Sequence, residues 1–121
     1  MEHLPVSINI KDKHCLVIGG GEIAARKAGL FIKAGAIVTV IAPKIEAEMK
    51  HHLSHCNVVW DVDTFSAEAM SHIPTPKYVV SAAGDDAVNQ AVYRYCQQHN
   101  IPVNVVERTE TEYGDFIFSD L

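Results

Sequence analysis

The chain has 121 residues, of which 48% are hydrophobic and 21% are charged, and its formal net charge is -5. This length fits one compact domain, and the composition excludes a disordered chain because it provides enough apolar surface for a core. The acidic balance argues against a general nucleic-acid or anionic-membrane binder, which would need a basic patch.

Strand-like and helix-like patterns alternate along the chain. Residues 14–18 form a short apolar run that stops at three glycines, which predicts a buried strand. Residues 22–34 repeat apolar positions at helical spacing up to Gly35, and residues 36–42 form a β-branched run closed by Pro43. By the same criteria we predict further helices over residues 45–53, 66–72 and 87–99, and further strands over residues 57–62, 77–82 and 102–106.

This alternation predicts the fold class. Strands that alternate with helices need crossover connections, so the sheet is expected to be parallel and covered on both faces. Right-handed crossovers then give a Rossmann-like, doubly wound α/β fold of three layers, with its ligand crevice at the carboxyl ends of the strands. We expect residues 1–121 to form this single NAD(P)-binding domain, with residues 113–118 either as a sixth strand or lying over the opening.

The three cysteines, Cys15, Cys56 and Cys96, lie far apart and form no C-x-x-C pair. This pattern is typical of reduced cytosolic thiols, and we expect two of them in or near the core. The N-terminus lacks the basic region of a signal peptide, and the longest apolar stretch, residues 34–43, is too short to cross a bilayer. We therefore expect a cytoplasmic protein whose partners include neither nucleic acid nor a membrane.

Residues 19–24, GGGEIA, match the dinucleotide-binding pattern G-x-G-x-x-G/A between a predicted strand and a predicted helix. Gly19 allows a tight turn, Gly21 lets a pyrophosphate approach the backbone, and Ala24 lets the helix pack close to the sheet. The N–H groups at the start of the helix favour the anion. The position inside a βαβ unit makes this a stronger signal than a lone match, and the alternative is a glycine-rich turn with no nucleotide.

One part of the usual dinucleotide site is missing. The second strand usually ends in an Asp or Glu that holds the adenosine ribose, but here residues 40–44 read VIAPK. The sequence therefore does not separate NAD from NADP on this criterion. Lys44 is compatible with a 2′-phosphate, although we favour its interpretation as a solvated lysine at the start of a helix.

The only cluster with metal-like composition is His51, His52, His55 and Cys56. His51 and His55 are four residues apart and would share one face of a helix, as in some zinc sites. Because no second ligand pair follows at the spacing of a zinc finger, we interpret these residues as solvated histidines and predict no metal site.

The glycine turn is one of a series of blocks that run through nearly the whole chain. They are residues 3–6 (HLPV), 15–24 (CLVIGGGEIA), 26–28 (RKA), 34–36 (AGA), 40–43 (VIAP), 82–86 (AAGDD), 88–89 (VN), 101–106 (IPVNVV) and 116–118 (FIF). In their order and spacing these blocks resemble the precorrin-2 dehydrogenase / sirohydrochlorin ferrochelatase family, which is the N-terminal module of siroheme synthase.

The resemblance implies an NAD-dependent oxidation of precorrin-2 to sirohydrochlorin, followed in some members by insertion of ferrous iron to give siroheme. It places the cofactor against three loops, at Gly21, Glu22, Ile23, Pro43, Lys44, Ala83 and Gly84. The acid/base residue of the family, an Asp, falls on Glu107.

Further side chains near the predicted crevice have two interpretations each. Asn104, in the last strand, either orients the substrate or bonds a neighbouring backbone group. Arg26 either attracts the carboxylates of the tetrapyrrole or is an exposed residue of an amphipathic helix. For Asp85 and Asp86 we favour capping of the following helix over a role in the crevice.

The chain also departs from the family pattern. Glu107 is one methylene longer than the Asp it replaces, and Gly84 stands where the family usually has Thr. The family continues beyond the point that matches Leu121, into a dimerisation region and a helical region, so we expect the homodimer of the family to need residues outside this sequence. Two other functions therefore remain alternatives to the enzyme: a non-catalytic NAD(P)-binding regulatory module, and a degenerate relative of the family.

Overall fold

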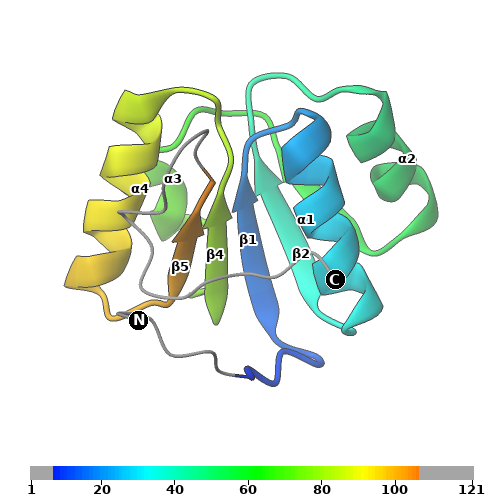
Figure 1. Cartoon of the computed structure of the whole chain (residues 1–121), viewed down its shortest axis with the longest axis horizontal. Helices are drawn as coiled ribbons and strands as arrows, with labels where there is room; N and C mark the ends of the chain where they lie inside the picture. Colours follow the sequence, from blue (N-terminus) through cyan, green and yellow to red (C-terminus); the bar gives the residue numbers. More distant parts are fainter. Residues whose placement is uncertain (1–6, 107–121) are drawn as a thin grey trace.

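The structure is a computed structural model that describes residues 7–106. Its five strands are parallel and form one sheet in the order β3-β2-β1-β4-β5. The strands are β1 (His14–Ile18), β2 (Ile37–Ile41), β3 (Val58–Asp61), β4 (Tyr78–Ser81) and β5 (Val103–Val105). The helices are α1 (Glu22–Lys33), α2 (Ala47–His55), α3 (Ala67–Ser71) and α4 (Asp86–Gln98). The strand order reverses beside β1, so the predicted doubly wound, Rossmann-like α/β fold is confirmed (Figure 1).

The helices divide between the two faces of the sheet, which gives the three predicted layers (Figure 1). On one face, Val17 of β1 and Val38 of β2 pack with residues of α1 and α2. On the other face, Leu16 of β1 and Val79 of β4 pack with residues of α3 and α4. Because both faces are covered, strand residues are buried whichever way they point, and this accounts for the continuous apolar runs in the sequence.

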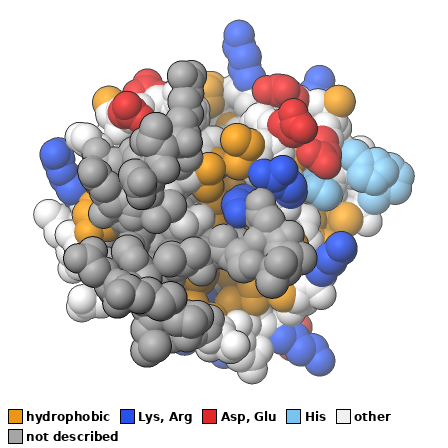
Figure 2. Space-filling view, viewed as in Figure 1, with side chains coloured by type: hydrophobic (Ala, Val, Ile, Leu, Met, Phe, Trp, Pro, Cys, Tyr) orange, Lys and Arg blue, Asp and Glu red, His pale blue; other side chains and the backbone are white. Residues whose placement is uncertain are grey.

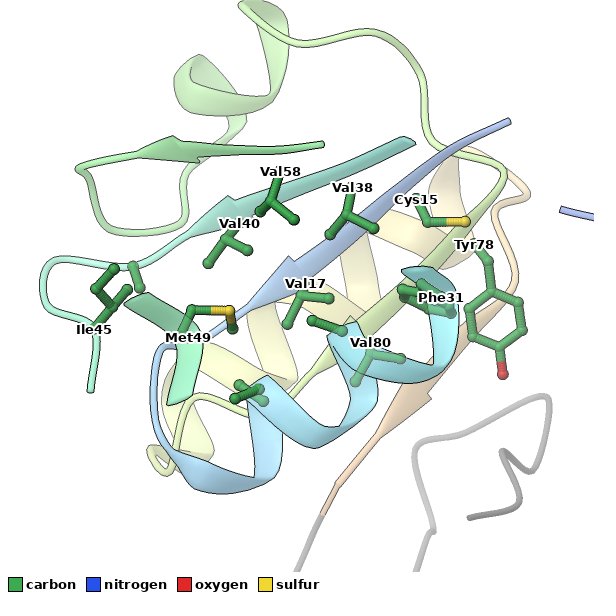
Figure 3. Close-up of a cluster of buried hydrophobic side chains, with 14 of the residues drawn as sticks. Cys15, Val17, Phe31, Val38, Val40, Ile45, Met49, Val58, Tyr78 and Val80 are labelled. Carbon is green, nitrogen blue, oxygen red and sulfur yellow. The ribbon is translucent and has the colours of Figure 1, made fainter. Parts of the chain in front are cut away.

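Helix α1 packs against the middle of the sheet, and the residues that make this contact are small except for one large aromatic residue. Ala24 and Ala28 are fully buried, which lets the helix axis approach β1 closely. Further along the same side of the helix, Phe31 meets Tyr78 of β4 edge to face, with ring centroids 5.8 Å apart. Met49 of α2 completes this core (Figure 3). Helix α1 is thereby fixed with its first residues at the carboxyl edge of the sheet.

The prediction for the second helix was wrong at its start. We expected it over residues 45–53, but α2 begins at Ala47 and ends at His55. Ile45 is buried in a loop, where its side chain and backbone lie against Gly20, so its apolar character reflects loop packing and not a helix face. The possible sixth strand over residues 113–118 lies outside the described residues.

The cysteines agree with expectation, because Cys15 and Cys96 are buried and Cys56 is half-buried. No helix within residues 7–106 has the length and apolar character that a bilayer crossing needs.

Cys15 gives a prediction for alkaline pH. Burial raises the pKa of its thiol from 9.0 to about 11, an effect that a hydrogen bond with the backbone of Tyr78 partly offsets. The unfolded chain therefore ionises this thiol at lower pH than the folded chain does, so the contribution to stability is complete below pH 9 and is lost as the pH rises to about 11. The pKa of Tyr78 is raised too, to about 12, by burial first and by the neighbouring Cys15 second.

We expect the urea midpoint of the wild-type chain to fall across this pH range, and that of Cys15→Ala to fall less steeply. Cys56→Ala removes a half-buried thiol and is the comparison variant against which the change in slope for Cys15→Ala is judged. Equal slopes for Cys15→Ala and the wild type would contradict the assignment.

Candidate functional site

Three loops meet where β1, β2 and β4 end, at residues 19–21, 42–46 and 82–85 (Figure 1). Backbone hydrogen bonds join them. The N–H of Gly19 donates to the carbonyl of Ile41 at 3.0 Å, and the N–H of Ala82 donates to the carbonyl of Ile18 at 2.8 Å. The site is therefore built on backbone that continues the sheet.

Gly19 makes the closest approach between two of these loops. Its φ of +123° is one that side-chain-bearing residues rarely adopt. A Cβ atom at this position would overlap the carbonyl group of Ala82, with the carbonyl carbon only 2.8 Å away. Gly19 is buried, so its role in the predicted tight turn is to let β1 and β4 end side by side.

Gly20 is required for a different reason, which the sequence pattern missed. The motif leaves this position unspecified, yet a Cβ atom here would overlap the carbonyl oxygen of Lys44 and lie 2.9 Å from the Cα atom of Ile45. The N–H of Glu46 donates to the carbonyl of Gly20 at 2.8 Å. The sequence did contain a signal for this contact. The motif needs glycine only at Gly19 and Gly21, so the additional glycine between them, Gly20, indicated a further close approach.

Gly21 and the start of α1 form the open part of the turn. Gly21 is the N-cap of the helix in an extended conformation. Within the described part of the chain it has no side-chain cap, and a Cβ atom added to it would meet only the carboxyl group of Glu46 within 4 Å. Glu22 and Ile23 follow, both exposed, whereas Ala24 is fully buried against the sheet, as predicted. An approachable backbone and uncapped N–H groups at the start of a helix fit a pyrophosphate.

The loop after β4 is held by a buried amide. The hydroxyl of Ser81 donates to Oδ1 of Asn89 at 2.6 Å, and the N–H of Ala83 donates to the same oxygen at 3.4 Å. Asp85 caps α4 by accepting the N–H of Ala87 at 2.9 Å, which confirms the favoured capping role. Asn89 was not singled out from the sequence, although it lies in one of the matching blocks.

Gly84 lies at the tip of the same loop with φ of +74°, and no atom of residues 7–106 lies within 4 Å of the place that a Cβ atom would take. The Thr expected from the family resemblance would be strained at this φ because its side chain is β-branched. Gly84 therefore differs from the Thr of the family in two ways. It lacks the hydroxyl, and its backbone has a conformation that favours glycine.

The remaining predicted residues are only partly brought together. Pro43 and Lys44 are exposed in the loop after β2, and Arg26 is exposed one turn into α1. Asn104 is not in the loop cluster: it is a buried residue in the middle of β5, opposite Val80. Its neighbours in the strand pack toward α4, so alternation places Asn104 on the face of the sheet that carries α1. Glu107, the predicted catalytic residue, lies outside the described residues.

The histidines of α2 are solvated only in part. His51 and His55 are exposed, as expected, and their rings stack with centroids 4.2 Å apart. Figure 2 shows histidine side chains at the surface on one side of the molecule. For His52 the expectation was wrong, because its Nε2–H donates to the carbonyl of Ala25 in α1 at 2.9 Å. Within residues 7–106 no group of three or more His, Cys, Asp or Glu residues is placed to hold a metal ion.

Comparison with known proteins gives one family whose model matches residues 6–120, described as "Putative NAD(P)-binding". A siroheme synthase of Hydrogenovibrio crunogenus is 50% identical over 117 residues, which are 97% of this chain and 24% of the relative. A siroheme synthase of Methylobacillus flagellatus is 40% identical over 91% of this chain and 23% of its own length. The chain thus spans about a quarter of the length of these curated relatives.

Among solved structures, SirC, a precorrin-2 dehydrogenase, matches with a TM-score of 0.74 and 27% identity, over 89% of this chain and 51% of that one. TcdA (CsdL) matches with a TM-score of 0.66 over 79% of this chain and 49% of its own, and its 19% identity shows a shared fold alone.

Proposed function

The chain belongs to this NAD(P)-binding family, as a relative of siroheme synthases and precorrin-2 dehydrogenases, and on that premise we propose that it oxidises precorrin-2 to sirohydrochlorin with NAD. The observation that carries the proposal is the glycine turn, whose open side and uncapped helix start fit a pyrophosphate, in a chain half identical to a siroheme synthase. The SirC likeness supports the choice of reaction because it extends over nearly all of this chain.

NAD, when bound, supplies the hydride acceptor: precorrin-2 loses one hydride to it and one proton to a base, which gives sirohydrochlorin. The residues of the chain bind and orient. In the proposal, the start of α1 holds the pyrophosphate, and the loop after β2 with Pro43 and Lys44 borders the adenosine. The loop after β4, fixed by Asn89, borders the nicotinamide through Ala83 and Gly84.

Two side chains complete the proposed chemistry. Glu107 follows β5 in the sequence and takes the proton, and Arg26, exposed on α1, attracts the carboxylates of the tetrapyrrole. Asn104 is buried in the sheet, and in this proposal it helps to hold the strands on which the site is built. We also propose that the chain inserts ferrous iron, as a substrate, into sirohydrochlorin. We propose further that two chains associate.

The test is turnover by the purified chain. With precorrin-2 and NAD we expect NADH and sirohydrochlorin to form in equal amounts, measured by NADH fluorescence and by the absorbance of the product. Glu107→Gln should lose turnover and keep NAD affinity, whereas Glu112→Gln, in the same acidic stretch, should keep both. A second assay with ferrous iron tests siroheme formation, and light scattering tests association.

Two results would overturn this function. Binding of NAD without any oxidation of precorrin-2 would identify a regulatory module. A melting temperature that does not change with millimolar NAD or NADP would identify a domain without a cofactor, because a ligand of the native state must stabilise it.

A further inference from the structure

We propose that the carboxylate of Glu46 binds the hydroxyls of the adenosine ribose and makes the site selective for NAD over NADP, an inference that rests on the proposed function. The starting point is the end of β2. In dinucleotide-binding domains an acid at this place holds the ribose, and the chain has Ala42, Pro43 and Lys44 there instead. Glu46 is the first acidic residue after the strand.

The backbone of Glu46 is fixed on the glycine turn. Its N–H donates to the carbonyl of Gly20 at 2.8 Å, and the preceding Ile45 is buried with its side chain against the same glycine. Because Gly20 has no side chain, the loop after β2 lies directly on the turn after β1. Glu46, which is the N-cap residue of α2, therefore lies in the part of the crevice where the adenosine half of a dinucleotide binds.

The side chain of Glu46 extends toward the open part of the turn. Its Oε2 lies 3.1 Å from the position of a Cβ atom on Gly21, and among residues 7–106 such an atom would meet no other group within 4 Å. Glu46 is exposed, and within residues 7–106 no hydrogen bond or ion pair engages its carboxylate. Figure 2 shows a group of acidic side chains over the region of α1 and α2, with lysine or arginine side chains beside it.

A free carboxylate at this place discriminates between the two cofactors. It accepts hydrogen bonds from the two neighbouring hydroxyls of the NAD ribose, and such charge-assisted bonds are stronger than neutral ones. NADP would place a phosphate dianion against it, where like charges repel. Lys44, the nearest cation in the sequence, contacts the turn through its backbone carbonyl, whereas Glu46 reaches Gly21 with its charged group. The carboxylate therefore determines the preference.

Calorimetric titration of the chain with NAD and, separately, with NADP tests this. We expect the wild type to bind NAD at least about tenfold more tightly than NADP. Glu46→Gln, which keeps the size and removes the charge, should weaken NAD binding by about tenfold and narrow the difference between the cofactors. Glu48→Gln is the matched control, because Glu48 is an exposed acid in the first turn of the same helix and should leave both affinities unchanged.

A melting curve of each variant without cofactor verifies that it is folded, which we expect because both side chains are exposed. The inference is overturned if Glu46→Gln binds NAD and NADP in the ratio of the wild type, or if the wild type prefers NADP. A wild type that binds neither cofactor contradicts the proposed function itself. This outcome differs from one in which NAD binds and the Glu46→Gln substitution has no effect on the two affinities.

Discussion

Gly19→Ala should destabilise the chain by about 4 kcal/mol, enough to leave a marginal domain largely unfolded. Two costs add. The φ of +123° is strained for any residue with a side chain, which costs on the order of 1–3 kcal/mol. The new Cβ atom would also overlap the carbonyl group of Ala82, a backbone atom that can move only if β1 and β4 separate at their carboxyl ends. The urea midpoint and the melting temperature measure the loss.

The chain offers a matched control for this substitution at Gly29. This glycine lies inside α1, and a Cβ atom there would be in ordinary contact with the ring of His52, 3.6 Å away. Gly29→Ala should therefore stabilise the chain by about 0.5–1 kcal/mol, since alanine is the better helix former. If both substitutions change stability equally, the close approach at Gly19 does not hold the loops together.

The fold could be predicted from the sequence because its signals are local. Most strands are short apolar runs beside a glycine or a proline, such as β1 before Gly19 and β2 before Pro43. Each long helix repeats apolar residues on one side. The predicted strand over residues 36–42 and the observed strand Ile37–Ile41 differ by one residue at each end. The start of α2 was wrong because Ile45 has the right spacing for a helix face, and its real partner, Gly20, is far away in the sequence.

The candidate site could be predicted only where its signal was local too. The glycine turn lies in six consecutive residues, and its place after β1 follows from the pattern itself. Asn104 was predicted inside the last strand, and the structure places it in the middle of β5, but its role toward the substrate stays a prediction. Asn89 and Glu46 were missed because their contacts are with Ser81 and Gly20, and the pattern around each of them is that of an ordinary helix.

Asn89→Ala should destabilise the chain by about 3 kcal/mol and loosen the loop after β4. Asn89 is 2% exposed, and its side-chain oxygen accepts from both the hydroxyl of Ser81 and the N–H of Ala83. Its loss leaves the fully buried hydroxyl of Ser81 without this partner, which costs about 1–3 kcal/mol, and leaves a small cavity besides. Gln98→Ala, at an exposed position of α4, is the control and should change stability by less than about 0.5 kcal/mol.

A double-mutant cycle separates the hydrogen bond from the packing around it. Ser81→Ala in the Asn89→Ala background removes the hydroxyl that lost its acceptor, so the double variant should be more stable than the sum of the two single losses predicts. Because Ala83 borders the proposed nicotinamide position, Asn89→Ala should also weaken NAD binding when measured where the variant is still folded. Additive losses in urea unfolding, together with unchanged NAD affinity, would mean that Asn89 merely fills space and does not set the loop.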